Sequence, residues 1–140
     1  MLSDADWIGL ANDYLPPNLS ALNARIVEGS RTDRFLQVSY RPGSESFTFM
    51  SLRGGCVAEM LDQTAAHCGT FVTSYGCPTL PMTAIYLHAG TGGAFVATAG
   101  LLAVTSASAV IDAELTDERE RLISSASIVV QLVKDFARYT

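Results

Sequence analysis

The chain is poor in charged residues. Only 16% of its 140 residues are charged, whereas 49% are hydrophobic. This composition excludes a disordered chain, and the length is sufficient for one domain with a buried core. With so few charged residues, a monomer would have too few charged side chains to cover its surface. We therefore expect another copy of the chain to cover part of that surface.

Basic residues are scarce and scattered. Nine Lys and Arg face fourteen Asp and Glu, which gives a net charge of −5, and no basic stripe is present. Nucleic acid is therefore not expected as a partner. A ligand that carries phosphates would have to use a few local cations or the N–H groups of a helix N-terminus.

Cysteines are also few. Cys56, Cys68 and Cys77 form an odd set, and neither they nor His67 and His88 show the spacing of metal ligands. Free thiols, no metal and a cytoplasmic location are the simplest interpretation. The opening letters MLSDADWIGL fit this location, because they lack the basic start and apolar core of a signal peptide.

One uncharged run needs an explanation. Residues 94–111 contain no charged side chain, and this is the minimum length for a membrane span. The second half of the run is rich in Ser, Thr and Ala, with Thr105, Ser106 and Ser108 where a turn would fall. Two strands joined by a turn fit better than a membrane helix, so no membrane partner is expected.

The remaining patterns predict secondary structure. Residues 1–17 form an N-terminal segment with a helix over 3–15, which Ser3 can cap and which prolines end. Residues 54–74 predict a long helix that is apolar on most sides. Alternating polar and apolar residues predict six strands. These strands are 22–30, 33–41, 78–87, 93–104, 107–117 and 121–133.

These elements predict one α+β domain over residues 1–140. Short connections favour antiparallel strands that lie side by side. Because the central helix is apolar on most sides, it must be covered on most sides. A strongly curved antiparallel sheet wrapped around the long central helix provides that cover.

Three motifs on and after the central helix occur in a specific order. They are RGG at 53–55, Asp62 eight residues after the first glycine, and Thr79 at the head of the next strand. Together they resemble the hotdog-fold thioesterases, and in particular the acyl-CoA thioesterases of the phenylacetate-pathway type. The resemblance extends over about residues 33–133. It implies a hotdog homodimer, often paired into a homotetramer, with active sites at the dimer interface.

The resemblance also implies an activity and its residues. Acyl-CoA would be hydrolysed, with Asp62 as nucleophile or as general base on water. The N–H groups of Gly54 and Gly55 would polarise the thioester carbonyl, and the partner subunit's Thr79 would position water or the carboxylate. Coenzyme A is then part of the substrate, and no cofactor is implied. The acyl group, and the choice between coenzyme A and acyl carrier protein, stay open.

Elementary chemistry agrees with these roles. Thioester hydrolysis needs hydrogen-bond donors for the carbonyl oxygen, and a helix N-terminus supplies free N–H groups. Gly54 and Gly55 have no Cβ to keep a substrate away, although they could simply turn the chain into the helix. A buried carboxylate such as Asp62 suits a base or nucleophile in a cleft. Alternatively, Asp62 could form an ion pair with Arg53 or with another subunit's arginine.

Four further residues are candidates for substrate binding. Arg53 stands where the family carries His or Gln, and its guanidinium can bind a carbonyl, a carboxylate or a phosphate. Glu59 and Gln63 extend a polar edge beside Asp62, although a charge at the dimer interface or its rim is the simpler interpretation of Glu59. His88 follows a strand and could contact the nucleotide of coenzyme A or simply lie at the surface.

Other functions remain open. Arg53, together with Phe47 where some relatives place Asn, favours a non-catalytic protein that binds acyl-CoA or another acyl thioester. Asp62 and His67 have the spacing of the hotdog enoyl-CoA hydratases, but on a helix they are ~140° apart and face different ways. Cys56 lies in the first helical turn, where a thiolate is favoured, although a small buried thiol is the simpler interpretation.

Overall fold

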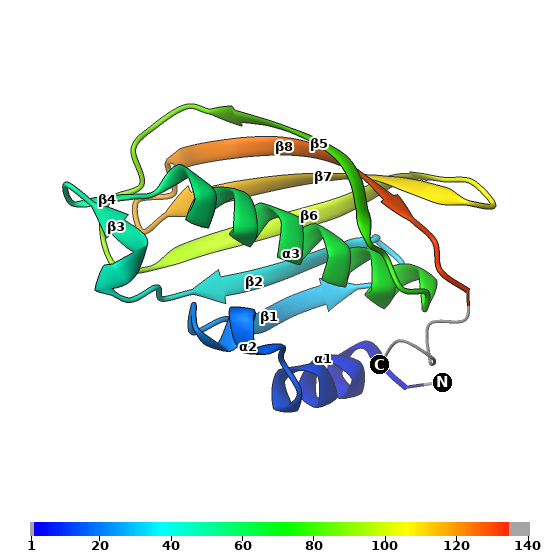
Figure 1. The fold of residues 1–140 in the computed structure, drawn as a ribbon. Helices are drawn as coiled ribbons and strands as arrows, with labels where there is room; N and C mark the ends of the chain where they lie inside the picture. The colour runs from blue at the N-terminus through cyan, green and yellow to red at the C-terminus, as the bar shows by residue number, and fades with distance from the viewer. Residues whose placement is uncertain (1, 135–140) are drawn as a thin grey trace.

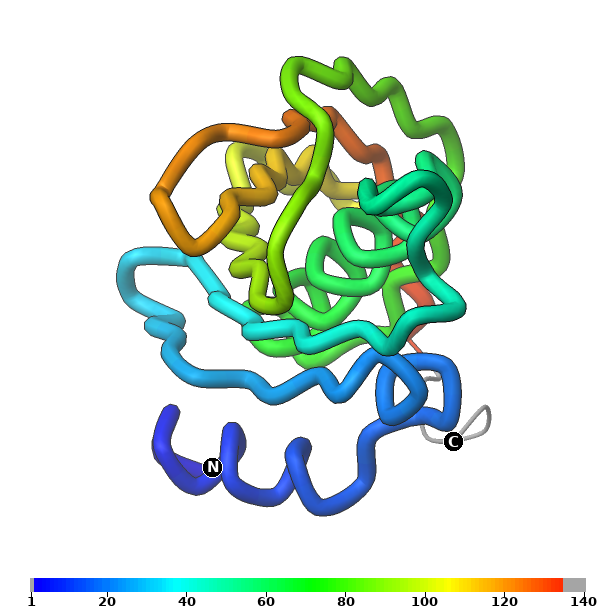
Figure 2. Tube along the Cα trace, turned by 90° about the vertical axis from the view of Figure 1, so that its left-hand side faces the viewer, coloured from blue at the N-terminus to red at the C-terminus, as the bar shows by residue number. Residues whose placement is uncertain are grey.

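The computed structural model describes residues 2–134. It contains one six-stranded antiparallel sheet and a long helix, α3 (Gly54–Thr73), that lies across the concave face of the sheet (Figure 1). The strands, in spatial order, are β1 (Arg25–Ser30), β2 (Phe35–Tyr40), β6 (Phe95–Val104), β7 (Ser108–Asp117), β8 (Leu122–Gln131) and β5 (Thr79–Tyr86). Figure 2 shows the sheet curving around α3. The predicted α+β hotdog fold is confirmed.

Burial on α3 follows the helical repeat. Its buried residues recur every three or four positions, from Val57 to Phe71. The buried hydroxyl of Thr64 lies 2.8 Å from that of Tyr40 and donates to the carbonyl of Met60. The opposite face of α3 is half-buried or exposed and contains Asp62. The sheet therefore covers one side of the helix and leaves the other side open.

One expected neighbour relation is wrong. β5 and β6 follow each other in the chain, but β5 pairs with β8 at the far edge of the sheet. The connecting residues 87–94 can span ~26 Å when extended, and the three strand spacings between β5 and β6 need only ~14 Å. A short connection therefore does not force β5 and β6 to pair. Hydrogen bonds from Leu87 N to Ile123 O (2.8 Å) and from Leu52 N to Gly90 O (2.8 Å) hold this crossing in place.

A second, two-stranded sheet was not predicted. β3 (Phe47–Thr48) and β4 (Ser51–Leu52) form a small hairpin that leads into α3 (Figure 1). Its strands are too short to show a periodic pattern in the sequence. The hairpin places its two-residue turn beyond the N-terminal end of α3.

The two edges of the main sheet differ. Helix α1 (Asp4–Asp13) lies along β1, and short α2 (Pro17–Ser20) follows it (Figure 1). The Asn12 side chain donates to Ile26 O (2.9 Å) and accepts from Ile26 N (2.8 Å), as a neighbouring strand would. Within residues 2–134 no strand pairs with the outer edge of β5. β5 is therefore the edge that remains open for pairing.

The long uncharged run forms β6, a turn and the start of β7, as predicted. In the turn, Thr105 N donates to Ser108 O (2.8 Å). Within residues 2–134, no helix combines the length and apolar character needed to cross a membrane.

Candidate active site

Two amide groups at the start of α3 are free. Arg53 is the N-cap residue; its N–H donates to Ser46 O (2.9 Å) and its carbonyl accepts from Cys56 N (2.9 Å). Among residues 2–134, no hydrogen bond uses the N–H of Gly54 or Gly55, and both residues are exposed. First-turn amides have no partner within their own helix. The positive end of the helix therefore offers two hydrogen-bond donors to an external acceptor.

The structure gives no internal reason for glycine at these two positions. Neither residue has a positive φ. A Cβ on Gly55 would meet nothing within 4 Å, and one on Gly54 would meet only the Tyr86 ring, at 3.9 Å. Turning the chain into the helix therefore does not require glycine here. The remaining advantage is close approach of a group from outside the chain.

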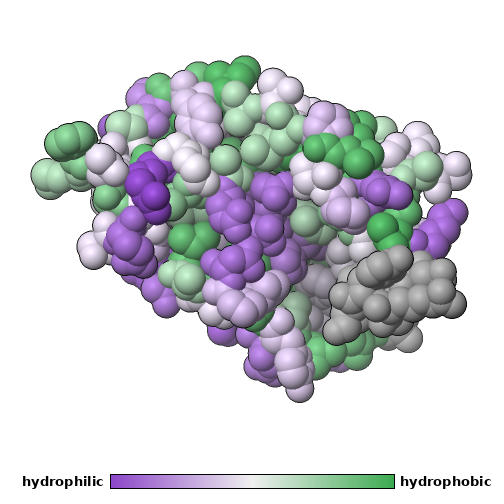
Figure 3. Space-filling view, in the orientation of Figure 1, coloured by the Kyte–Doolittle hydropathy of each residue, from purple (hydrophilic) through white to green (hydrophobic). Residues whose placement is uncertain are grey.

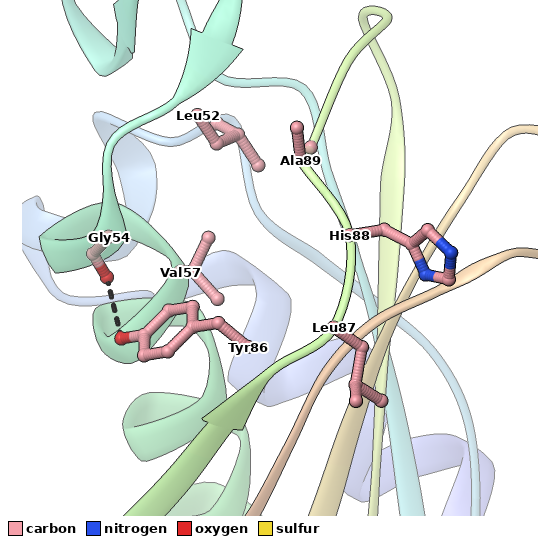
Figure 4. A pocket seen from close by; sticks show the side chains of 8 residues that line it. Leu52, Gly54, Val57, Tyr86, Leu87, His88 and Ala89 are labelled. Atoms are coloured by element: carbon pink, nitrogen blue, oxygen red, sulfur yellow. Dashed lines mark hydrogen bonds between the residues drawn. The ribbon is translucent and has the colours of Figure 1, made fainter.

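A hollow of about 370 Å³ adjoins Gly54 (Figure 4), whereas Gly55 lines a separate hollow between α3 and α2. Its lining includes Leu52, Gly54, Val57, Tyr86, Leu87 and Ala89. The Tyr86 hydroxyl donates to the Gly54 carbonyl (3.0 Å), which joins the end of β5 to the start of α3. Sequence reasoning missed Tyr86. The period of two along β5 places it on the same face as Ala84, and this was the available signal.

His88 lies at the edge of this hollow, away from Gly54. The residue lines the hollow, but its ring points away from Gly54 and Val57 in Figure 4. Its Nδ1 lies 3.0 Å from the carbonyl of Leu122. This contact favours the interpretation of His88 as a surface residue at a strand end.

Asp62 and Thr79 meet within one chain. The Thr79 hydroxyl donates to Asp62 Oδ1, and both residues are half-buried. The resemblance implied that the threonine would come from a partner subunit, and the structure instead places it beside the aspartate of its own chain. The loop after α3 allows this contact, because it returns β5 alongside the helix.

Of the two alternative partners for Asp62, Arg53 of the same chain does not contact it. Within residues 2–134 no ion pair joins Arg53 to Asp62. Instead, Arg53 Nη2 lies 3.5 Å from Cys56 Sγ. Arg53 is exposed and directly precedes the two residues with free amides.

The free amides and the carboxylate are well separated along α3. Gly54 and Asp62 are eight positions apart, and a rise of 1.5 Å per residue puts them ~12 Å apart along the axis. Asp62 does not line the hollow at Gly54. One chain therefore does not bring its own amides and its own carboxylate to a single carbonyl group.

Two of the remaining candidate residues share a second hollow. Arg53 and Glu59 line a space of about 400 Å³ between α3 and α2. Glu59 Oε1 accepts a hydrogen bond from Asn18 Nδ2 (2.7 Å), so it also holds α2 in place. Gln63 is half-buried and does not line this space. The polar edge predicted for Glu59, Asp62 and Gln63 is thus divided between separate environments.

The competing functional residues do not assemble into sites. His67 lines a different hollow, between α1 and α3, and its Nδ1 lies 2.9 Å from Gln63 O. Burial lowers the pKa of His67, and the contact with Gln63 O offsets this only in part. His67 does not meet Asp62, so the hydratase-type pair is not formed. Phe47 packs against Phe95, with ring centroids 6.4 Å apart.

The described residues hold no cluster of three His, Cys, Asp or Glu side chains suited to a metal ion. Cys56 is half-exposed in the first turn of α3, and Cys68 and Cys77 are buried. Burial raises the pKa of the Cys68 thiol to about 12 and also raises the pKa of Cys77. Cys68 and Cys77 are therefore protonated and unreactive near neutral pH.

Comparison with known proteins now identifies the family. Residues 51–124, which include the start of α3, Asp62 and Thr79, match the thioesterase superfamily. The chain belongs to the thioesterase superfamily. A comparison of this thioesterase-superfamily chain with curated proteins gives no match.

Solved structures with low sequence identity share the fold of this chain. The PaaI protein of Escherichia coli, from the phenylacetic acid degradation operon, is 17% identical with a TM-score of 0.82, over 93% of this chain and 94% of that one. A phenylacetic acid degradation-related protein from Ralstonia eutropha JMP134 is 19% identical with a TM-score of 0.80, over 85% and 92%. A Streptococcus mutans UA159 protein bound to acetyl CoA is 17% identical with a TM-score of 0.72, over 79% and 89%.

Proposed function

We propose that this protein is an acyl-CoA thioesterase whose active site is completed by a second copy of the chain. One observation carries the proposal. The free amides of Gly54 and Gly55 and the carboxylate of Asp62 lie on α3 but ~12 Å apart along its axis, and Thr79 of β5 donates a hydrogen bond to that carboxylate. At ~100° per residue, Asp62 is only about 20° from Gly55 around the helix axis. The two halves therefore face the same way and can meet the complementary halves of a second helix.

Two-fold symmetry would bring the free amides of one copy to the Asp62 carboxylate of the other. If two α3 helices pack antiparallel so that Gly55 lies opposite the partner subunit's Asp62, the axis passes between Ala58 and Glu59. The small side chain of Ala58 lets the helices approach closely. Symmetry then generates two identical sites. The open edge of β5 supports this pairing, because an exposed strand edge favours association with another chain.

The proposed reaction uses each half for one task. The thioester carbonyl oxygen accepts hydrogen bonds from Gly54 N–H and Gly55 N–H, which stabilise the negative charge that develops there. The partner subunit's Asp62 takes a proton from a water molecule as that water attacks the carbonyl carbon. The C–S bond then breaks, and the leaving thiolate of coenzyme A takes the proton from Asp62, which restores the carboxylate and leaves the free acid as the second product. Thr79 orients the Asp62 carboxylate by donating to Oδ1, so Oδ2 is free to accept the proton.

Several features support coenzyme A as the carrier. The Streptococcus mutans protein of this fold was solved with acetyl CoA bound. The hollow beside Gly54 is partly apolar and opens at the surface, which suits the pantetheine arm. Arg53 is exposed at the same end of α3 and can bind a phosphate or a carbonyl group. The proposal needs no metal or redox cofactor, and pairing of dimers into a homotetramer rests on the resemblance alone.

An assay of coenzyme A release tests the proposal. A panel of acyl-CoA and aryl-acyl-CoA thioesters is offered to the wild type and to Asp62→Asn, which keeps the shape of the side chain. We expect turnover by the wild type and a loss of about 100-fold or more in Asp62→Asn, because general-base catalysis contributes ~10²–10⁴-fold. Undiminished turnover in Asp62→Asn would remove Asp62 from the mechanism.

The same panel tests the second candidate, a non-catalytic acyl-CoA binding protein. The exposed Arg53 beside two free amides favours this candidate, because together they can hold an anionic or carbonyl ligand without chemistry. Tight binding of the thioesters by the wild type with no release of coenzyme A would favour the binding protein over the enzyme.

A further inference from the structure

Tyr86 reaches the start of α3 from the end of β5. Its hydroxyl donates to the Gly54 carbonyl (3.0 Å), and a Cβ on Gly54 would lie 3.9 Å from the ring. Figure 4 shows the side chain extending from the strand to the first turn of the helix. This hydrogen bond therefore connects the sheet to the helix terminus that carries the two free amides.

The accepting carbonyl belongs to the same peptide group as the free N–H of Gly55. A peptide group is planar, so holding the Gly54 carbonyl also fixes the direction in which the Gly55 N–H points. Hydrogen bonds in a chain polarise one another, so the bond that this carbonyl accepts makes the Gly55 N–H a stronger donor. Tyr86 therefore acts on one of the two proposed donors from the opposite end of its peptide group.

The other free N–H is held by the helix itself. The N–H of Gly54 shares its peptide group with the Arg53 carbonyl, which accepts from Cys56 N (2.9 Å) and Val57 N (3.1 Å). The next peptide group lies between two glycines, the residues with the fewest restrictions on backbone conformation. A carbonyl oxygen has two lone pairs, so the Gly54 carbonyl can accept from Tyr86 in addition to a bond within the helix. The bond from β5 thus restrains the more permissive of the two peptide groups.

The end of β5 is itself fixed to the neighbouring strand. On one side of Tyr86, Leu87 N donates to Ile123 O (2.8 Å). On the other side, Ser124 Oγ donates to Ile85 O (2.7 Å). Both bonds join β5 to β8, which lies inside the main sheet. The sheet can therefore hold Tyr86 in place against the start of α3.

We propose that Tyr86 is a positioning residue, which orients and polarises the Gly55 N–H for the thioester carbonyl oxygen. This inference rests on the proposed function, because it assigns Tyr86 a role in the site that stabilises the developing negative charge. Donors that are held in place before the reaction stabilise this charge without having to reorganise. Tyr86 acts through the peptide group and does not itself touch the reacting atoms. Tyr86 and Gly55 belong to the same chain, so this part of the site is complete in each copy.

Tyr86→Phe removes the hydroxyl and keeps the ring. We expect kcat for coenzyme A release to fall about 3- to 10-fold, with KM changed by less than about twofold, because the lost bond strengthens a donor that acts mainly in the transition state. The matched control is Ser124→Ala, which removes a hydrogen bond at the same end of β5 without touching α3 and should keep the wild-type kcat. Equal kcat values for Tyr86→Phe and an active wild type would overturn the inference, and so would an equal loss in Ser124→Ala.

Amide NMR separates this role from a purely structural one and from the proposed function. A hydrogen bond to a peptide carbonyl changes the electron density at the nitrogen of the same peptide group. We therefore expect the amide nitrogen resonance of Gly55 to shift in Tyr86→Phe and to stay in place in Ser124→Ala. An unshifted Gly55 resonance in an active enzyme would refute the positioning and leave the thioesterase intact. A shifted resonance in a protein that releases no coenzyme A would refute the thioesterase and support the action of Tyr86 on the Gly55 N–H.

Discussion

A carboxylate on a largely apolar helix needs a polar partner, and Thr79 supplies one for Asp62. Both residues are half-buried, so the contact is partly shielded from water. A hydrogen bond to a charged group contributes ~1.5–3 kcal/mol, more than one between neutral groups. In the proposed mechanism Thr79 is therefore a positioning residue, which holds the Asp62 carboxylate through this hydrogen bond.

Removing the Thr79 hydroxyl is expected to lower activity more than stability. Thr79→Val keeps the side-chain shape but leaves Asp62 without its donor. We expect kcat to fall about 10- to 100-fold, because the loss of a hydrogen bond worth ~1.5–3 kcal/mol corresponds to a rate change of this size. Thr79→Ser restores the hydroxyl and should restore most of the rate. Equal kcat values for Thr79→Val and wild type, measured by coenzyme A release, would show that Asp62 does not depend on this donor.

At the scale of the element, α3 begins with residues that weaken a helix. Glycine inside a helix costs about 0.5–1 kcal/mol relative to alanine. Gly55 has space for a Cβ and a backbone that any residue adopts, so its presence is not explained by folding. In the proposed mechanism, the glycine lowers helix stability but gives a substrate access to the free amides.

Gly55→Ala separates these two effects. The free energy of unfolding should stay equal or rise by up to about 1 kcal/mol, because alanine favours the helix. At the same time kcat/KM should fall, because the added methyl group stands beside the amide donors. Thermal denaturation at fixed protein concentration and coenzyme A release measure the two changes. A variant with full activity would show that no substrate approaches this glycine.

The helices and strands show which features of the fold sequence patterns predict and which they do not. The central helix was expected over 54–74 and runs from Gly54 to Thr73, because its apolar period is long and unbroken. The neighbour relation of β5 was wrong, since a connection of eight residues permits either a hairpin or a crossing. The β3–β4 hairpin was missed because its turn, Phe49–Met50, contains none of the usual turn residues.

At the scale of the whole molecule, the two edges of the main sheet differ, because one is covered and the other is open. α1 covers β1, and Asn12 satisfies the backbone groups of Ile26 at that edge. β5 keeps an open edge with exposed apolar side chains such as Leu80 and Ile85. Figure 3 shows hydrophilic residues gathered over the region where Figure 1 places the middle of α3. A polar site beside an open edge fits a site shared by two copies.

The site was only partly predictable. Gly54, Gly55 and Asp62 came from motif order, and the structure adds that the two amides are free and that Thr79 bonds to Asp62 within the same chain. Tyr86 was missed, because the period of two along β5 predicts the face on which its side chain lies but not its contact with the start of α3. Spacing along one sequence does not say which chain supplies each residue.

The most direct test of the shared site mixes two inactive variants. Asp62→Asn removes the carboxylate, and Gly55→Val blocks the amides while its Cβ meets nothing within 4 Å. Each variant alone should be inactive. In a mixed dimer, one site combines an intact amide half with an intact carboxylate half, so random mixing should restore about a quarter of wild-type coenzyme A release. No recovery in a mixture proven by mass spectrometry to contain mixed dimers would contradict a site shared between two copies.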